Sequence, residues 1–250
     1  MSSRFFIENI IGNIAEIEGS ETHHLKNVLR KKIGDVVFLF DGKGNQYKAE
    51  IEKIEESRII FRIISKTQID IESKIRINLY QSLPKFKKLD FIIEKTTELG
   101  VAKVIPMISE RTQYSIQDET KNSHKLSRWQ KIAISASKQS GRTAVPEIFP
   151  IKSFKNAIES LDKDLKTSIS LIAWECEEKN KLKDIFLPMT QHRELSDINL
   201  FIGPEGGFSD TEIEFAKKNS LIPISLGKRI LRTETAPIVM ISNIIYELDL

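Results

Sequence analysis

The second part of the chain alternates between strand-like and helix-like segments, and this alternation restricts the fold more than any other feature. After residue 74, short apolar or β-branched runs are separated by segments whose apolar residues have helical spacing. Strands that alternate with helices predict an α/β domain built on a mainly parallel sheet. The strand-like runs are IRINLYQ (75–81), KVIPMIS (103–109), SISLIAWE (168–175), INLFIG (198–203) and LIPISLG (221–227).

Local signals mark several of the helices. Ser209 and Glu212 have the spacing of a capping box, in which each residue binds a backbone N–H at the helix start. Leu126, Trp129 and Ala133 form one apolar stripe, so we expect Trp129 to lie in the core and not to stack on a base. The predicted helices include KLDFIIEKTTELG (88–100), SDTEIEFAKKN (209–219) and a last one over residues 235–248.

The first 70 residues are rich in strand patterns and predict a small β-barrel with one helical insertion, ETHHLKNVLR (21–30). The polar stretch KTQIDIESK (66–74) is the candidate linker. We therefore predict two domains, residues 1–70 and residues 74–250. The strand-like runs of the first domain include residues 36–40 and 58–65.

Composition excludes several classes of protein. No run of 18 apolar residues exists, so no membrane span is predicted. A single cysteine, Cys176, excludes an intrachain disulfide and fits a cytoplasmic protein. With one cysteine and four scattered histidines, no zinc pattern is present and we predict no metal site.

Two glycine turns follow strand-like runs late in the chain. GPEGG (203–207) has neither Walker A nor GxGxxG spacing, so it is either a ligand-binding turn or a tight strand-to-helix turn. The second turn, LGKRILRTETA (226–236), concentrates charge between a predicted buried strand and a helix. It could be a solvated loop with Arg232 paired to Glu234, although Ile230 and Leu231 argue against that interpretation. Ligands of open α/β sheets bind at such strand ends.

The sequence resembles a known family at these turns and elsewhere. FIGPEGGFSDTEIE (201–214) and SLGKRILRTETA (225–236) resemble the bacterial family that methylates N3 of a uridine in 16S ribosomal RNA, part of the SPOUT superfamily. The similarity extends over the whole chain. Further matching segments are HHLKNVLRKKIGD (23–35), QSLPKFKKLDFIIEKTTELGV (81–101), SERT (109–112) and KQSGRTAVP (138–146), the last with Lys138 where a glutamate is expected.

The resemblance implies a homodimer in which a PUA-like β-barrel precedes a trefoil-knotted methyltransferase domain. The barrel helps to hold RNA, and the knot wraps the two turns into one pocket for S-adenosylmethionine. The substrate it implies is 16S ribosomal RNA of the small ribosomal subunit. The cofactor-binding residues implied in this sequence are Gly203, Pro204, Glu205, Gly206, Leu226, Gly227, Ile230, Leu231 and Ala236.

Methylation of uridine N3 requires that N3 lose its proton. A base could remove the proton, or a cation could stabilise the anion that results. We expect Arg232 to be that cation, with Glu234 as the base or as a partner that orients Arg232. Glu205 is either a second acid in the site or a residue that interacts with the N-terminus of the next helix.

Basic residues cluster in three places and predict phosphate contacts. Residues 120–146 include six lysines and arginines but no aspartate or glutamate. Lys121, Lys125 and Arg128 fall on one helical face. His23 and His24 are better explained by RNA contact or helix capping than by catalysis. The predicted RNA-contact residues are His24, Lys26, Arg30, Lys31, Lys85, Lys125, Arg128 and Arg142.

Two other functions remain open. A SPOUT enzyme that methylates ribose 2′-oxygens would need less help to deprotonate its target, but LGKRILRTETA disfavours it. A non-catalytic RNA-binding protein would keep the barrel, but the two intact turns disfavour that alternative.

Overall fold

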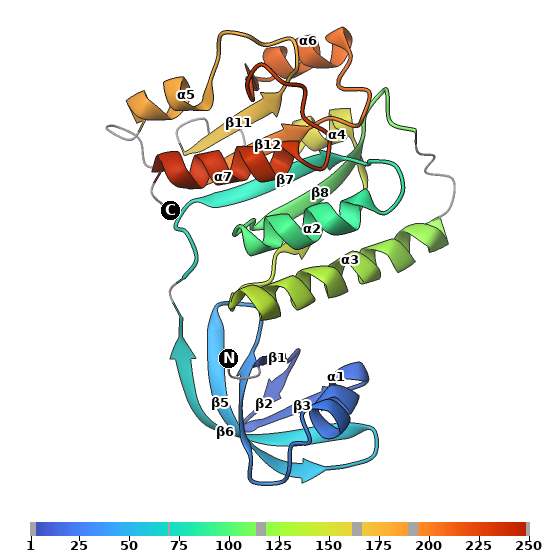
Figure 1. Ribbon diagram of the computed structural model, residues 1–250, viewed down its shortest axis with the longest axis vertical. Coiled ribbons are helices and arrows are strands. Elements are labelled where there is room, and N and C mark those ends of the chain that lie inside the picture. Colours follow the sequence, from blue (N-terminus) through green and yellow to red (C-terminus); the bar gives the residue numbers. More distant parts are fainter. Residues whose placement is uncertain (1–3, 70, 114–118, 162–166, 190–194, 249–250) are drawn as a thin grey trace. The chain divides into compact units, whose positions relative to one another are not determined.

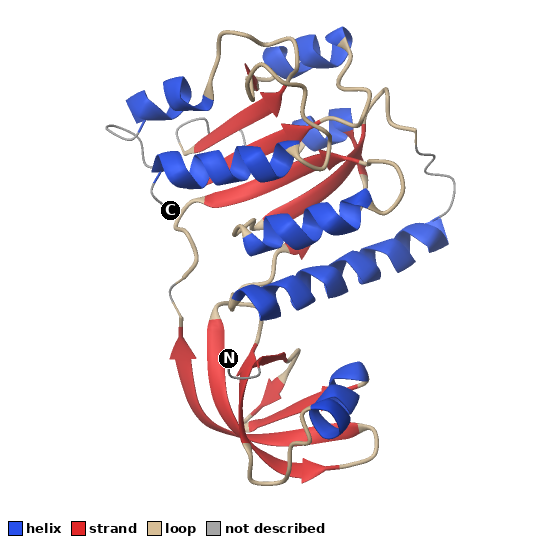
Figure 2. Ribbon diagram, in the orientation of Figure 1, coloured by secondary structure: helices blue, strands red, loops and turns tan. Residues whose placement is uncertain are grey.

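The computed structural model describes residues 4–69, 71–113, 119–161, 167–189 and 195–248, and they form two compact units (Figures 1 and 2). Unit 1 comprises residues 1–72 and 134–145, and unit 2 comprises residues 73–133 and 146–250. The division therefore falls within helix α3, Glu119–Ser140. None of the described helices has both the length and the apolar character that a membrane crossing requires.

The strands of unit 1 form one sheet in the order β1-β4-β5-β6-β3-β2. The pair β1 and β4 is parallel and the other pairs are antiparallel. Alternating side chains such as Phe5, Leu39 and Phe61 are fully buried and build the core. The elements are β1 (Arg4–Phe6), β2 (Ile10–Ile11), β3 (Ile14–Glu18), α1 (Ser20–His23), η1 (His24–Val28), β4 (Val36–Phe40), β5 (Asn45–Ile54) and β6 (Arg58–Gln68).

Two predictions in this unit need correction. The expected helix over residues 21–30 is a short α-helix followed by the π-helix η1, in which Leu29 N donates to His24 O at 3.0 Å. The expected linker begins too early, because β6 continues to Gln68 and pairs with the start of β5. The backbone N–H and C=O groups of these residues are hydrogen-bonded within the sheet although their side chains are polar. The polarity of the side chains therefore does not show where the strand ends.

The strands of unit 2 form a parallel sheet, as the sequence predicts, in the order β10-β8-β7-β12-β11-β13 with β9 beside β8. The elements, together with α3, are β7 (Arg76–Ser82), α2 (Lys88–Glu98), β8 (Lys103–Ile108), β9 (Glu147–Ile148), β10 (Lys152–Ser153), α4 (Phe154–Glu159), β11 (Ser168–Ala173), α5 (Leu182–Met189), β12 (Asp197–Ile202), α6 (Asp210–Lys218), β13 (Ile222–Ile224) and α7 (Ala236–Leu248).

Helices cover both faces of this sheet. Helices α4 and α6 pack on the face that carries Tyr80 and Phe201. Helices α2 and α7 lie together on the opposite face (Figure 1). Trp129 is buried, as predicted. Ser209 and Glu212 form the predicted capping box.

Phe201 lies on the face of the sheet that α4 and α6 cover. It is fully buried and stacks on Tyr80 with ring centroids 4.3 Å apart. We expect Phe201→Ala to lower the free energy of unfolding by about 3–5 kcal/mol, because it leaves a cavity in a packed core. Urea denaturation followed by circular dichroism measures this loss. The half-exposed Phe91 is the control, and an equal loss in Phe91→Ala would contradict this account of the core.

Candidate active site

Three strand ends meet at one edge of the unit 2 sheet. Strand β11 pairs in parallel with β12 on one side and with β13 on the other. The turns that follow these strands therefore lie close together, although the turn after β11 is about 30 to 50 residues away in sequence from the other two. They enclose a cavity of about 390 Å³.

The cavity brings together most of the residues predicted to bind the cofactor. All of them except Gly206 contribute to its wall, as does Arg232. Gly206 instead contacts Arg111, whose Nη1 donates to the Gly206 carbonyl at 2.9 Å. The wall also includes Gly207, Lys228, Arg229 and Thr233 from the two predicted turns. Lining residues outside those turns that the sequence analysis did not assign to the cofactor are Lys88, Ala173, Trp174, Glu175, Ile202, Phe208 and Ser225.

Both the available space and the backbone conformation favour glycine in the first turn. A Cβ on Gly203 would lie 3.3 Å from both the Phe208 ring and the Gly207 carbonyl carbon. Gly207 has φ +69°, and a Cβ there would overlap the carboxylate of Glu175. The turn after β12 is thus packed directly against the turn after β11.

Thr233 connects the second turn to the first. Its hydroxyl donates to the Gly203 carbonyl at 2.7 Å and accepts from Gln81 Nε2 at 3.1 Å. Both Thr233 and Gln81 are buried, so these bonds form away from water. From the sequence, RTET (232–235) was notable only for its charges, so the role of the Thr233 hydroxyl was not predicted. The one signal that could have indicated a buried hydrogen bond was the polar Gln81 at the end of an apolar strand.

Lys88 holds two carboxylates, one from each turn. Its Nζ lies 3.0 Å from Glu205 Oε1 and 3.1 Å from Glu234 Oε2. The hydrogen bond to Glu205 is the main reason that the pKa of Lys88 is raised. Burial tends to raise the pKa of Glu205, but hydrogen bonds from Lys88 and from Lys85 N bring it below its usual value. Glu234 therefore pairs with Lys88 and not with Arg232, which corrects the pairing considered from the sequence.

Arg232 is exposed at the cavity wall, and no described carboxylate forms an ion pair with it. Its backbone carbonyl accepts from Thr235 N at 2.8 Å and from Ala236 N at 2.9 Å, which fixes the start of α7. The chain is thus anchored at this residue while the guanidinium stays available to an anion. No described cluster of His, Cys, Asp or Glu could hold a metal ion.

Comparisons with known proteins identify the family. A family profile described as an RNA methyltransferase domain matches residues 71–245, and one described as an RNA methyltransferase PUA domain matches residues 17–64. The chain is 31% identical over 252 residues to Ribosomal RNA small subunit methyltransferase E of Bacillus subtilis (strain 168). The aligned region covers 99% of this chain and 97% of that protein. The chain belongs to this methyltransferase E family.

Two solved structures resemble the chain over its full length. Methyltransferase E from Neisseria gonorrhoeae, bound to S-adenosylmethionine, is 33% identical with a TM-score of 0.86. A methyltransferase from Legionella pneumophila, also with bound S-adenosylmethionine, is 31% identical with a TM-score of 0.87. In both cases 98% of each chain is covered.

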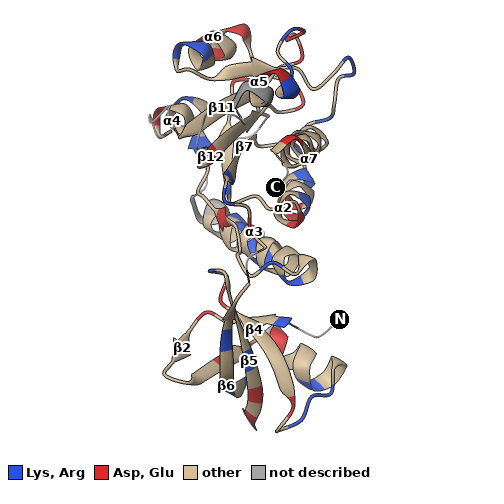
Figure 3. Ribbon diagram, turned by 90° about the vertical axis from the view of Figure 1, so that its left-hand side faces the viewer, with Lys and Arg blue, Asp and Glu red and all other residues tan. Residues whose placement is uncertain are grey.

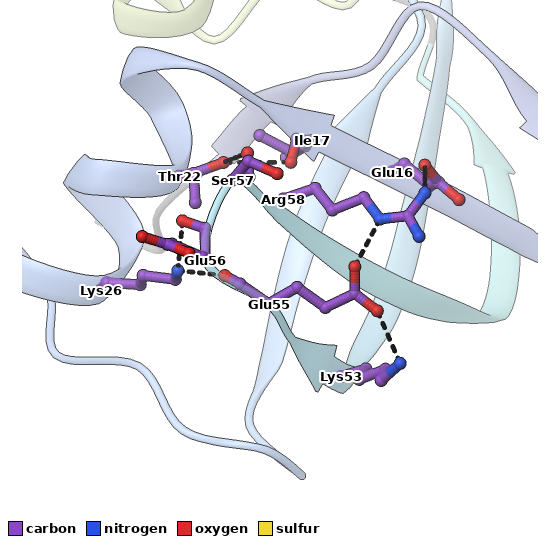
Figure 4. Close-up of polar contacts among 9 residues, drawn as sticks. All are labelled: Glu16, Ile17, Thr22, Lys26, Lys53, Glu55, Glu56, Ser57 and Arg58. Atoms are coloured by element: carbon purple, nitrogen blue, oxygen red, sulfur yellow. Dashed lines mark hydrogen bonds and ion pairs between the residues drawn. The ribbon is translucent and has the colours of Figure 1, made fainter.

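The basic residues predicted to contact RNA fall into separate environments. In unit 1, Lys26 Nζ donates to the carbonyls of Glu55 and Glu56, so it holds the β5–β6 turn (Figure 4). The His24 ring lies 6.2 Å from the ring of Phe5. Arg30 is exposed and Lys31 is half-buried.

Arg142 belongs to the interior of unit 1. It is only 6% exposed, and its Nη2 lies 2.7 Å from Glu72 Oε2. A guanidinium that is buried and paired with a carboxylate is not presented to a phosphate, so its burial disfavours the predicted RNA contact. Lys138, where a glutamate was expected, lies over the Phe5 ring and pairs with Glu21 at 2.8 Å.

In unit 2 the structure brings Lys85, Lys125 and Arg128 together around a second cavity of about 420 Å³. Arg128 forms an ion pair with Asp90 of α2. Lysine and arginine recur along α3, which has no acidic residue after Glu119 (Figure 3). The side chain of Lys121 lies outside the described residues.

The bond between Thr233 and Gly203 can be tested by removing the hydroxyl alone. We expect Thr233→Val to lower the free energy of unfolding by about 1–3 kcal/mol, because the Gly203 carbonyl loses the hydroxyl that donates to it and the Gln81 amide keeps only its bond to the Ser82 carbonyl. Chemical denaturation measures the change. Thr235→Val is the matched control, since the Thr235 hydroxyl makes no hydrogen bond with the described residues. Equal stabilities for the two variants would show that the bond does not hold the turns together.

Proposed function

We propose that this protein transfers the methyl group of S-adenosylmethionine to N3 of a uridine in 16S ribosomal RNA of the small ribosomal subunit. One observation carries the proposal. In a chain of the methyltransferase E family, the two predicted turns meet around one cavity at the carboxyl ends of parallel strands, and its wall includes Arg232, which forms no ion pair with a described carboxylate.

The cavity suits the proposed cofactor in size and chemistry. Its volume, about 390 Å³, lies in the range of small-molecule sites. Phe208, Ile230 and Leu231 offer apolar surface, and Glu175 offers a carboxylate to hydroxyl groups. Backbone groups of residues 203–205 and 226–231 would hold the adenine and methionine ends. When bound, S-adenosylmethionine supplies a methyl group on a sulfonium, which is transferred by direct displacement.

Arg232 is proposed as the catalytic residue. Uridine N3 carries a proton at neutral pH, and its loss leaves an anion spread over N3, O2 and O4. A guanidinium placed beside that anion stabilises it and favours the ionised, nucleophilic form. The lack of a described carboxylate partner supports Arg232 in this role. Glu234, held by Lys88, is better suited to position that lysine and the loop than to remove the proton.

The resemblance and family membership support three further proposals. The segment containing residues 225–236 is threaded as a trefoil knot, the unit 1 sheet closes as a PUA-like barrel that contacts RNA, and two copies form a homodimer. Of the cations of unit 1 that were predicted to contact RNA, Lys26 is held by backbone carbonyls, so we propose that the exposed Arg30 and the half-buried Lys31 contact phosphates.

The product of the reaction tests the proposed function. Small ribosomal subunits from cells that lack this protein are incubated with the protein and S-adenosylmethionine, and their nucleosides are identified by mass spectrometry. We expect 3-methyluridine at one site. A 2′-O-methylated nucleoside would assign the chain to the alternative reaction, and no methylated product would reject methyltransferase activity on this RNA.

The role of Arg232 makes a separate prediction. Arg232→Ala should slow the single-turnover rate by about 10²–10³, the effect of losing one well-placed electrostatic donor. Raising the pH should partly rescue it, because more uridine then ionises without help. Arg232→Lys should recover only part of the rate, since lysine lacks the planar fork of arginine. If Glu234→Gln is instead the slower variant with the stronger rescue, Glu234 is the base.

A further inference from the structure

Phe86 combines two unfavourable features that the cofactor cavity does not explain. It lies in the segment between β7 and α2, and its side chain is 93% exposed. Its backbone has φ 57°, a left-handed conformation that bulky residues rarely adopt. Glycine or asparagine would suit that backbone, and a polar side chain would suit that exposure. An aromatic ring in this position therefore suggests a binding role.

The surroundings of Phe86 favour an unpaired nucleotide. The cavity of about 420 Å³ that it borders has an apolar floor, which includes Leu83, Leu89 and Trp129. Lys85, Lys87 and Lys125 contribute to its wall. The acid in the wall, Asp90, is occupied by Arg128. An exposed ring surrounded by lysines matches how proteins bind single-stranded nucleic acid, with the base stacked and the phosphates near cations.

The segment is also tied to the first cavity. Lys85 N donates to Glu205 Oε1 at 3.1 Å, and Lys88, two residues beyond Phe86, pairs with the same carboxylate. Glu205 belongs to the wall of the first cavity. The turn that carries Phe86 is thus anchored to the turn that we propose binds the cofactor, so RNA bound at one would lie near the other.

We propose that a nucleobase next to the methylated uridine stacks on Phe86, with its phosphates facing Lys85, Lys87 and Lys125. The proposal rests on the proposed function, because it deepens the account of the same RNA substrate. It names a contact outside the cofactor cavity that holds the RNA strand beside it.

Two substitutions at Phe86 separate the ring from the backbone. Phe86→Gly removes the ring and accepts the left-handed conformation without strain, so the fold is retained. Phe86→Tyr keeps the ring and the same backbone requirement. Tyr246, which is 85% exposed on α7 and borders neither cavity, provides the control Tyr246→Ala. Each variant is measured for binding of labelled oligouridylate and for methylation of small ribosomal subunits.

We expect Phe86→Gly to weaken binding of oligouridylate about ten-fold and to raise KM for the subunits, with kcat within about two-fold of wild type. Phe86→Tyr and Tyr246→Ala should match wild type in both assays. Calorimetry should give all variants the same affinity for S-adenosylmethionine.

If Phe86→Gly matches wild type in RNA affinity and KM, the stacking proposal is wrong, even though the wild type methylates RNA. Unchanged RNA binding with an altered sedimentation coefficient would assign Phe86 to contact with a second copy and also overturn it. Failure of the wild type to form 3-methyluridine would instead count against the proposed function, so the two failures are distinguishable.

Discussion

Parallel pairing of β11 with both β12 and β13 is the constraint on which the site depends. It places the ends of three strands at one edge of the sheet. Two contacts then hold the turns together. A buried hydrogen bond from Thr233 joins the loop after β13 to the Gly203 turn, and Gly207 lies against the exposed side chain of Glu175 after β11. The proposed cofactor pocket follows from strand order and a few short-range contacts.

The charged residues discussed for the site differ in whether they form ion pairs. Lys88 pairs with both Glu205 and Glu234, whereas Arg232 has no carboxylate partner among the described residues. A free guanidinium beside a closed group of paired charges can respond to an anion that forms during reaction. The same Glu205 anchors the Phe86 turn through Lys85 N, so the two cavities share one polar connection.

The sequence predicted the parallel α/β sheet and the two glycine turns, because strand–helix alternation and glycine spacing are local patterns. It did not predict that Lys88 pairs with Glu205 and Glu234, or that Thr233 bonds to Gly203. These contacts join residues far apart in the chain and depend on strand order. Arg142 shows the opposite error. Its charge suggested a contact with phosphate, but the amino-acid composition cannot show that its side chain is buried against Glu72.

Hydrogen exchange with and without S-adenosylmethionine tests the central claim, that three turns form one cofactor pocket. We predict that binding protects backbone amides in all three turns, near residues 174–176, 203–207 and 226–233, and leaves the strands of unit 1 unchanged. Saturating cofactor that protects a different part of the chain, or only one of the three turns, would contradict the account.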